Sequence, residues 1–293
     1  MSGEGAGAAL RQVVGSSRPF SWINTAYPFA AAYLLGGGRV DVTFVLGTVF
    51  FLVPYNLAMY GINDVFDHES DLRNPRKGGL EGVVLSTRWH RLTLWSAALS
   101  CAPFLVYLLA VGSWAARAAL VVSMFAVVAY SARGLRFKER PVLDSLTSST
   151  HFVSPAVVAL ALVDAEVTTV TVCALVAFFV WGAASQAFGA VQDITADRDA
   201  GIASIATHLG ARRTVRAALV AYVVAAVVLV GTGWPGVLAA VPALAYAASV
   251  APFWNLTDAR CEEANRGWRR FLWLNLLTGF WLTQLFIWVA LTR

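Results

Sequence analysis

The sequence predicts an all-α membrane protein that crosses the bilayer nine times. Hydrophobic residues make up 58% of the 293 residues and charged residues only 13%, whereas soluble domains carry about 25% charged residues. The chain contains nine apolar segments, and the basic residues between them are concentrated in alternate loops. This combination excludes a disordered chain and a soluble globule.

The nine segments each approach the length of about 20 apolar residues that a helix needs to cross the hydrocarbon core. We expect spans at 20–37, 42–62, 92–111, 116–130, 143–163, 167–191, 215–232, 236–253 and 271–292. The stretches between them are too short for a soluble domain. We therefore expect one transmembrane domain over residues 1–293, with residues 1–19 as a cytoplasmic N-terminal segment.

The loop charges predict the orientation. With the N-terminus in the cytoplasm, nineteen of the 22 basic residues fall in cytoplasmic segments, and only Arg39, Arg117 and Arg293 fall outside. Cytoplasmic loops of membrane proteins carry this excess of Lys and Arg. We therefore expect a multi-pass protein of the cell membrane. The net charge of +5 then needs no nucleic-acid partner.

The end of the second span carries a set of oxygen ligands. Asn63, Asp64, Asp67 and Asp71 are separated by one, three or four residues. Spacings of three and four place side chains on one face of a helix, and neighbouring carboxylates repel unless a cation lies among them. Mg²⁺ takes one or two carboxylates and completes its octahedron with water and phosphate oxygens. We call these four residues the first carboxylate set.

The sixth span ends in a matching pair. Asp193 and Asp197, which we call the second carboxylate set, are again four residues apart. Both sets lie on the same predicted side of the membrane. Two sets that faced each other would hold Mg²⁺ ions and one diphosphate between them. Carboxylates this close to a bilayer are candidates for function by default, so we expect the reaction on the cytoplasmic side.

Basic and phenolic side chains near the sets suit a diphosphate. Arginine and lysine bind phosphate oxygens directly. The candidates follow the first set or lie in the next cytoplasmic loop: Arg73, Lys77, Tyr130, Arg136 and Lys138. Mg²⁺ beside a diphosphate neutralises the charge that develops as the C–O bond breaks. An apolar cavity would protect an allylic cation from water.

The two carboxylate sets, and Tyr130 with the basic run to Lys138, resemble the UbiA superfamily of intramembrane prenyltransferases. The resemblance implies a helical bundle around a central cavity, Mg²⁺ as cofactor and a prenyl diphosphate donor. It also implies that Asn63, Asp67 and the second carboxylate set bind Mg²⁺ and diphosphate. Asp64 and Asp71 would share or support that role, and Asp67, Asp71 and the second set would act in catalysis.

Four segments, at 21–28, 71–79, 187–193 and 201–207, are similar to the lycopene elongase branch of that superfamily. This similarity implies transfer of a dimethylallyl group from dimethylallyl diphosphate to lycopene, on the way to longer-chain carotenoids. Asp71 is a candidate base by position only. Proton loss and capture of water both remain open as the final step. A carotenoid cyclase acting on the product is a further partner that this role suggests.

Other acceptors and classes stay open at this point. The same chemistry serves a quinone precursor, a chlorophyll, bacteriochlorophyll or haem precursor, or a glycerol phosphate lipid. No lysine or arginine lies within an expected span away from its ends, which favours an apolar acceptor. A transporter would place charges near the bilayer midplane, whereas the acids here lie at span ends. A subunit without activity is disfavoured because both sets are present.

Overall fold

The computed structural model describes residues 3–72 and 84–292, and the side chains of residues 5–69, 72 and 84–292. In this part of the chain the regular secondary structure is helical. The helices form two compact units, one comprising Met1–Arg136 with Ser154–Ala165 and the other Phe137–Val153 with Glu166–Arg293. One of the three points at which the chain passes between the units, Val153 to Ser154, lies within helix α8 (Leu143–Leu162).

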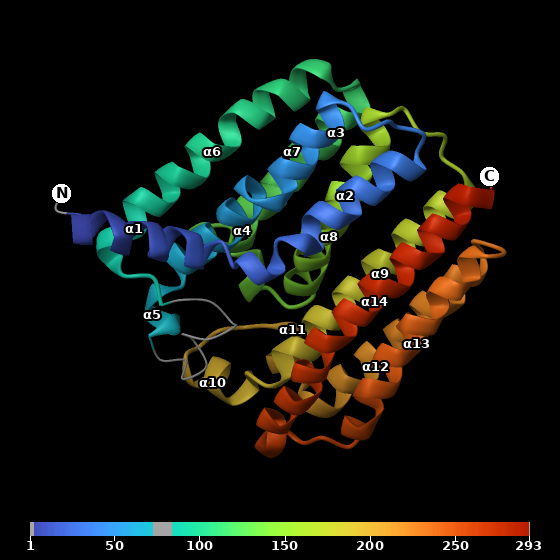
Figure 1. Cartoon of the computed structure of the whole chain (residues 1–293). Helices are drawn as coiled ribbons and strands as arrows, with labels where there is room; N and C mark the ends of the chain where they lie inside the picture. Colours follow the sequence, from blue (N-terminus) through green and yellow to red (C-terminus); the bar gives the residue numbers. More distant parts are fainter. Residues whose placement is uncertain (1–2, 73–83, 293) are drawn as a thin grey trace. The chain divides into compact units, whose positions relative to one another are not determined.

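The first unit holds the N-terminal helices (Figure 1). They are α1 (Gly3–Ser16), η1 (Pro19–Ser21), α2 (Ile23–Leu35), α3 (Val42–Leu52), α4 (Pro54–Phe66), α5 (His68–Asp71), η2 (Thr87–Trp89), α6 (His90–Val111) and α7 (Trp114–Ser131). Helix α4 packs against α6, α7 and α3. The core of the first unit contains four fully buried aromatic side chains: Phe29, Phe50, Phe51 and Tyr55.

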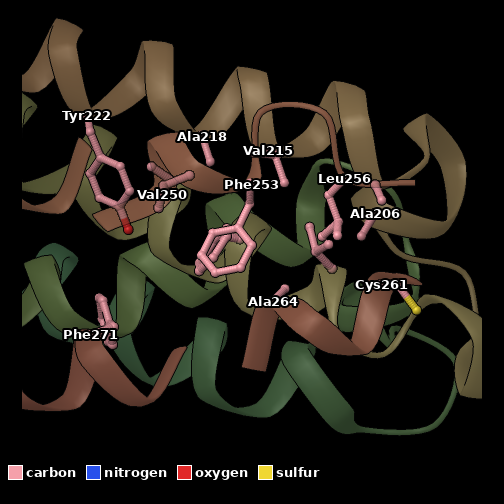
Figure 2. Packing of buried hydrophobic residues seen from close by; sticks show 14 of the residues in the cluster. Ala206, Val215, Ala218, Tyr222, Val250, Phe253, Leu256, Cys261, Ala264 and Phe271 are labelled. Atoms are coloured by element: carbon pink, nitrogen blue, oxygen red, sulfur yellow. The ribbon is translucent and has the colours of Figure 1, made fainter. Parts of the chain in front are cut away.

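The second unit holds the C-terminal helices. They are η3 (Phe137–Glu139), the start of α8, α9 (Thr169–Val191), α10 (Ile194–Asp199), α11 (Ile205–Leu209), α12 (Ala211–Val230), η4 (Gly236–Ala239), α13 (Ala240–Val250), η5 (Ala251–Phe253), η6 (Asp258–Ala264) and α14 (Asn265–Thr292). Helix α12 packs against both α9 and α13. Tyr222, Val250, Phe253 and Phe271 belong to the core of this unit (Figure 2).

Eight helical segments in the described residues are long and apolar enough to cross a membrane. They coincide with the second to ninth expected spans, so the all-α transmembrane prediction is confirmed. The expected first span corresponds to η1 and α2, and α2 has only 13 residues. The count of nine and the cytoplasmic N-terminus therefore stay predictions. The N-terminal segment contains a helix, α1, that we did not anticipate.

The expected span at 42–62 is broken into two helices. Pro54 begins α4 directly after α3 ends, because proline has no N–H to continue the hydrogen-bond ladder. The buried Asn56 amide repairs the break. Its Nδ2 donates to the carbonyl oxygens of Phe51 at 2.9 Å and Leu52 at 3.0 Å, and to Thr25 Oγ1 at 2.7 Å. Carbonyls left without a donor in a bilayer are costly.

Replacing this amide tests the repair. We expect Asn56→Leu to lower the free energy of unfolding by about 1–3 kcal/mol, because the Leu52 carbonyl loses this donor and the Phe51 carbonyl keeps only the Thr25 hydroxyl, at 2.6 Å. Thermal unfolding in detergent micelles measures the change. Thr150→Val is the matched control, since the Thr150 hydroxyl only donates a hydrogen bond to the carbonyl of Leu146, one turn earlier in the same helix. Equal shifts for the two variants would contradict this account.

Candidate active site

The first carboxylate set lies where α4 ends. Helix α4 stops at Phe66, and Asp67 is its C-terminal cap, with its backbone N–H donating to the carbonyl of Asn63 at 2.9 Å. Asn63 and Asp67 are thus one helical turn apart, as the spacing predicted. The Asn63 Oδ1 accepts a hydrogen bond from Ser131 Oγ at 2.9 Å. This bond ties the set to the end of α7.

A single helix through the whole first set is not what the structure shows. The chain begins a new short helix, α5, after Asp67, so the expectation of one continuous helical face was wrong beyond Asp67. The backbone of Asp71 ends α5, and its side chain lies outside the description. Arg73 and Lys77, expected to bind diphosphate, also lie outside the described residues.

Asp64 is fully buried and lies beside an arginine from the N-terminal segment. Arg18 Nη2 is 3.4 Å from Asp64 Oδ1, and the Arg18 guanidinium lies over the Tyr60 ring at 4.3 Å. A buried carboxylate needs a nearby positive charge, and Arg18 supplies one. Sequence reasoning counted Arg18 only among the cytoplasmic basic residues, because nothing in its local sequence indicates a partner 46 positions away.

Arg136 also lies at the first set. Its Nη2 is 3.8 Å from Asp67 Oδ1, and the side chain of Asp67 is only 11% exposed. The structure thus brings together Asp67 and one of the arginines expected to bind diphosphate. Tyr130 is half-buried near the end of α7 in the same unit. Lys138 is half-buried in η3, which belongs to the second unit.

The second carboxylate set likewise lies at a break between two helices. Asp193 follows the end of α9 and precedes α10, and Asp197 N donates to Asp193 O at 2.8 Å. The two residues are therefore one helical turn apart, and both are half-buried. The neighbouring Gln192 is buried and accepts a bond from Asn265 Nδ2 at 2.6 Å. This bond joins the end of α9 to the start of α14.

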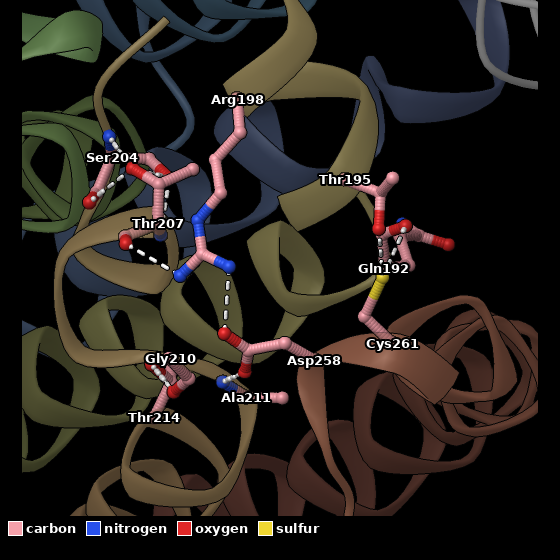
Figure 3. Close-up of polar contacts among 10 residues, drawn as sticks. All are labelled: Gln192, Thr195, Arg198, Ser204, Thr207, Gly210, Ala211, Thr214, Asp258 and Cys261. Carbon is pink, nitrogen blue, oxygen red and sulfur yellow. Dashed lines mark hydrogen bonds and ion pairs between the residues drawn. The ribbon is translucent and has the colours of Figure 1, made fainter.

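A polar network fixes α10 to the rest of its unit (Figure 3). Arg198 Nη1 donates to Asp258 Oδ2 at 2.7 Å, and Arg198 Nη2 donates to Thr207 O at 3.0 Å. Asp258 Oδ1 accepts from Ala211 N at 2.7 Å. The residue before Ala211 is Gly210, which has no side chain to cap α12, so Asp258 caps this helix from a distant segment. Arg198 and Asp258 were not among the expected site residues.

A further buried acid supports the loop after α10. Asp144, at the start of α8, is 1% exposed, and its Oδ2 accepts from Ile205 N, the first residue of α11, at 2.8 Å. This bond adds to the capping box that Ser204 and Thr207 form at the same helix start. Only its position near a span end, on the predicted side of the carboxylate sets, distinguishes Asp144 in the sequence.

The residues present fit Mg²⁺ with a diphosphate. Within residues 3–72 and 84–292, no group of three His, Cys, Asp or Glu side chains is placed to hold a metal ion. Mg²⁺ needs only one or two carboxylates when phosphate oxygens and water complete its shell. Asn63 with Asp67, and Asp193 with Asp197, each offer two hard oxygen donors one turn apart. Asp64, held beside Arg18, has a counter-charge already.

A profile of the UbiA prenyltransferase family matches residues 25–289. The chain therefore belongs to the UbiA prenyltransferase family. A lycopene elongase/hydratase of Corynebacterium glutamicum is 53% identical over 278 residues, which cover 95% of this chain and 97% of the relative.

A second relative is the C(50) beta-cyclic carotenoids biosynthesis protein LbtBC of Dietzia sp. It is 57% identical over 277 residues, which cover 94% of this chain but only 64% of that protein. With these relatives, the chain is a prenyltransferase of the lycopene elongase type, which confirms the prediction. The transporter alternative is thereby set aside.

The fold has solved counterparts. A UbiA homolog from Archaeoglobus fulgidus was solved bound to GPP and Mg²⁺, with a TM-score of 0.69 and 18% identity. It was also solved bound to DMAPP and Mg²⁺, with a TM-score of 0.68 and 19% identity. The matches cover 91% of this chain and 99% and 98% of those chains. At this identity they confirm the fold.

The cap that Asp258 supplies is testable. We expect Asp258→Ala to lower the free energy of unfolding by about 1–2 kcal/mol, because α12 loses its cap and Arg198 its partner. Thermal unfolding in detergent gives the shift. Glu262→Ala, an exposed acid of the same segment η6, should shift the midpoint little. An Asp258 variant as stable as the unaltered protein would show that α12 needs no cap from η6.

Proposed function

We propose that this enzyme transfers a dimethylallyl group from dimethylallyl diphosphate to lycopene, with Mg²⁺ as cofactor, in the biosynthesis of longer-chain carotenoids. The observation that carries the proposal is the pair of carboxylate sets: each contains two oxygen-bearing residues one helical turn apart, and each lies at a helix break beside a membrane span. Lycopene as the acceptor is supported by the name of the Corynebacterium lycopene elongase/hydratase, which is 53% identical over 95% of this chain.

The donor and the metal have separate support. The Archaeoglobus homolog of the same fold binds DMAPP with Mg²⁺. In this chain we assign Asn63 and Asp67, with Asp193 and Asp197, to the metal and the diphosphate, and Asp64 and Asp71 share or support that role. When bound, Mg²⁺ would neutralise the charge that develops on the leaving diphosphate. Arg73, Lys77, Tyr130, Arg136 and Lys138 are the proposed ligands of its oxygens.

The reaction balances with these parts. The bond between the first carbon of the prenyl group and the diphosphate oxygen breaks, and its electron pair leaves with the diphosphate. The terminal double bond of lycopene attacks the allylic cation, and a new carbon–carbon bond forms. The resulting tertiary cation either loses a proton, giving an alkene, or adds water and then loses a proton, giving an alcohol. The Corynebacterium relative is named for elongation and for hydration.

The setting of the enzyme is part of the proposal. The excess of basic residues in alternate loops supports nine spans in the cell membrane, an N-terminus in the cytoplasm and a reaction on the cytoplasmic side. A single transmembrane domain over the chain is part of the same proposal. In this scheme η1 and α2 form the short first span. A carotenoid cyclase as partner stays a prediction. The name of the Dietzia relative, which refers to cyclic carotenoids, supports it.

Carotenoid analysis tests the acceptor and the carboxylates together. Expression in cells that accumulate lycopene should give carotenoids heavier by one or two five-carbon units, measured by mass spectrometry. We expect Asp67→Asn and Asp193→Asn each to reduce product about 10²–10³-fold, because stabilisation of the leaving group is lost. Asp199→Asn, an exposed acid in α10, is the matched control and should retain product.

Two results would contradict this prediction. Unchanged lycopene with well-expressed protein would overturn the acceptor and direct attention to quinone, tetrapyrrole or glycerol phosphate lipid acceptors. Product made equally well by the Asp67 and Asp193 variants would remove the carboxylate sets from the mechanism. A product heavier by the mass of one water molecule would show that water captures the final cation, which then does not form an alkene by proton loss.

Metal removal gives an independent test. We expect EDTA to abolish turnover of purified enzyme, and excess Mg²⁺ to restore it, because the paired carboxylates would otherwise repel the diphosphate. Turnover is measured with a labelled prenyl diphosphate in detergent or proteoliposomes. The unfolding midpoint with and without EDTA is the control for loss of structure. Full turnover in EDTA would exclude a metal-dependent reaction.

A further inference from the structure

The turn between α13 and α14 contains a hollow of about 270 Å³ in the second unit. Phe253 and Leu256, which line it, are buried residues of the core (Figure 2). Its charged lining consists of Arg260 and Glu263 from η6 and two arginines from the first turns of α14. The hollow therefore joins an apolar base to a polar rim and shares no residue with either carboxylate set.

The rim carries a net positive charge. Glu263 holds two arginines together: Arg260 Nε and Nη2 donate to its two oxygens at 2.5 and 3.0 Å, and Arg266 Nη2 donates at 2.8 Å. The side chains of Arg260 and Arg266 remain 69% and 63% exposed. Arg270 also lines the hollow and makes no hydrogen bond or ion pair within the described part of the chain. One carboxylate thus faces three arginines.

Side chains typical of the membrane surface adjoin the hollow. Arg216 Nη2 donates to Asn255 Oδ1, a lining residue, at 3.2 Å. The Arg216 guanidinium also lies over the Trp254 ring at 4.6 Å, and Trp254 is 41% exposed. Tryptophan and basic side chains concentrate at the level of lipid headgroups. The hollow thus lies at the end of the membrane spans, where headgroups are found.

An exposed apolar stripe leads away from the hollow along α14. Trp273, Leu277 and Phe280 follow Arg270 at intervals of three and four residues, which places all four on one helix face. These three side chains are 72%, 64% and 66% exposed. In a multi-pass membrane protein such a face contacts acyl chains. The face therefore presents a cation at one end and an apolar surface along the rest.

We propose that this hollow binds the headgroup of an anionic phospholipid. Its phosphate would lie against Arg266 and Arg270, and its acyl chains along Trp273, Leu277 and Phe280. Guanidinium groups match phosphate oxygens in charge and geometry, and basic pockets between membrane helices suit anionic headgroups. A zwitterionic headgroup would bring its own cation to the positive rim, and free phosphate would leave the apolar stripe unused.

Native mass spectrometry of the full, delipidated protein tests the proposal. The probes are dioleoyl phosphatidylglycerol, dioleoyl phosphatidylcholine with the same acyl chains, and inorganic phosphate. We expect phosphatidylglycerol to bind at least about tenfold more tightly than phosphatidylcholine, and Arg266→Gln/Arg270→Gln to lower its affinity about tenfold or more. Arg270→Gln alone, which leaves the Glu263 bridges in place, should lower it several-fold.

The control variant is Arg212→Gln/Arg213→Gln, which removes the same charge from two exposed arginines of α12. It should bind phosphatidylglycerol like the unaltered protein. An equal loss in this control would show general attraction by charge and overturn the site. Equal binding of phosphatidylcholine would do the same. Displacement of the lipid by millimolar phosphate would show a free-anion site instead. Arg270→Gln decides the matter if the double variant fails to fold.

Discussion

A carboxylate buried at the end of a membrane helix needs a cation beside it, and this requirement shapes the structure around the first carboxylate set. Removing a charge from water costs several kcal/mol unless it is paired. In the first unit, Arg18 reaches the fully buried Asp64, and Arg136 lies near Asp67. In the second unit, Arg198 of α10 forms an ion pair with Asp258 of η6. The arginines of the interface thus have specific acidic partners as well as a general role in orientation.

The two carboxylate sets share a local design. In each set the second acid donates its N–H to the carbonyl of the residue four positions earlier, and a helix ends or begins within the set. One helical turn keeps the oxygens on one side, while the helix break lets the chain leave the span. Side chains from other helices then hold each break in place: Ser131 contacts Asn63, and Asn265 contacts Gln192. A side chain from another helix thus holds the chain at each helix break.

The sequence was sufficient for the parts of the fold that depend on local pattern. Span positions follow from runs of apolar residues, and the family resemblance follows from short acidic motifs. The helix break at Pro54 has a visible signal, but length and hydropathy alone merged α3 and α4. The partners of Asp64 and Ala211 have no local signal, since Arg18 and Asp258 lie far away in the chain. Such pairings depend on tertiary packing, which composition and spacing do not encode.

We propose that both carboxylate sets act on one metal-bound diphosphate. Calorimetric titration with a non-reactive thiolo analogue of dimethylallyl diphosphate and Mg²⁺ tests it directly, using Asp67→Asn, Asp193→Asn and the double variant. If the sets share a ligand, each single change should weaken binding nearly as much as both together, with a coupling of at least about 1.4 kcal/mol, or tenfold. Losses that simply multiply, or a single variant that binds normally, would contradict the account.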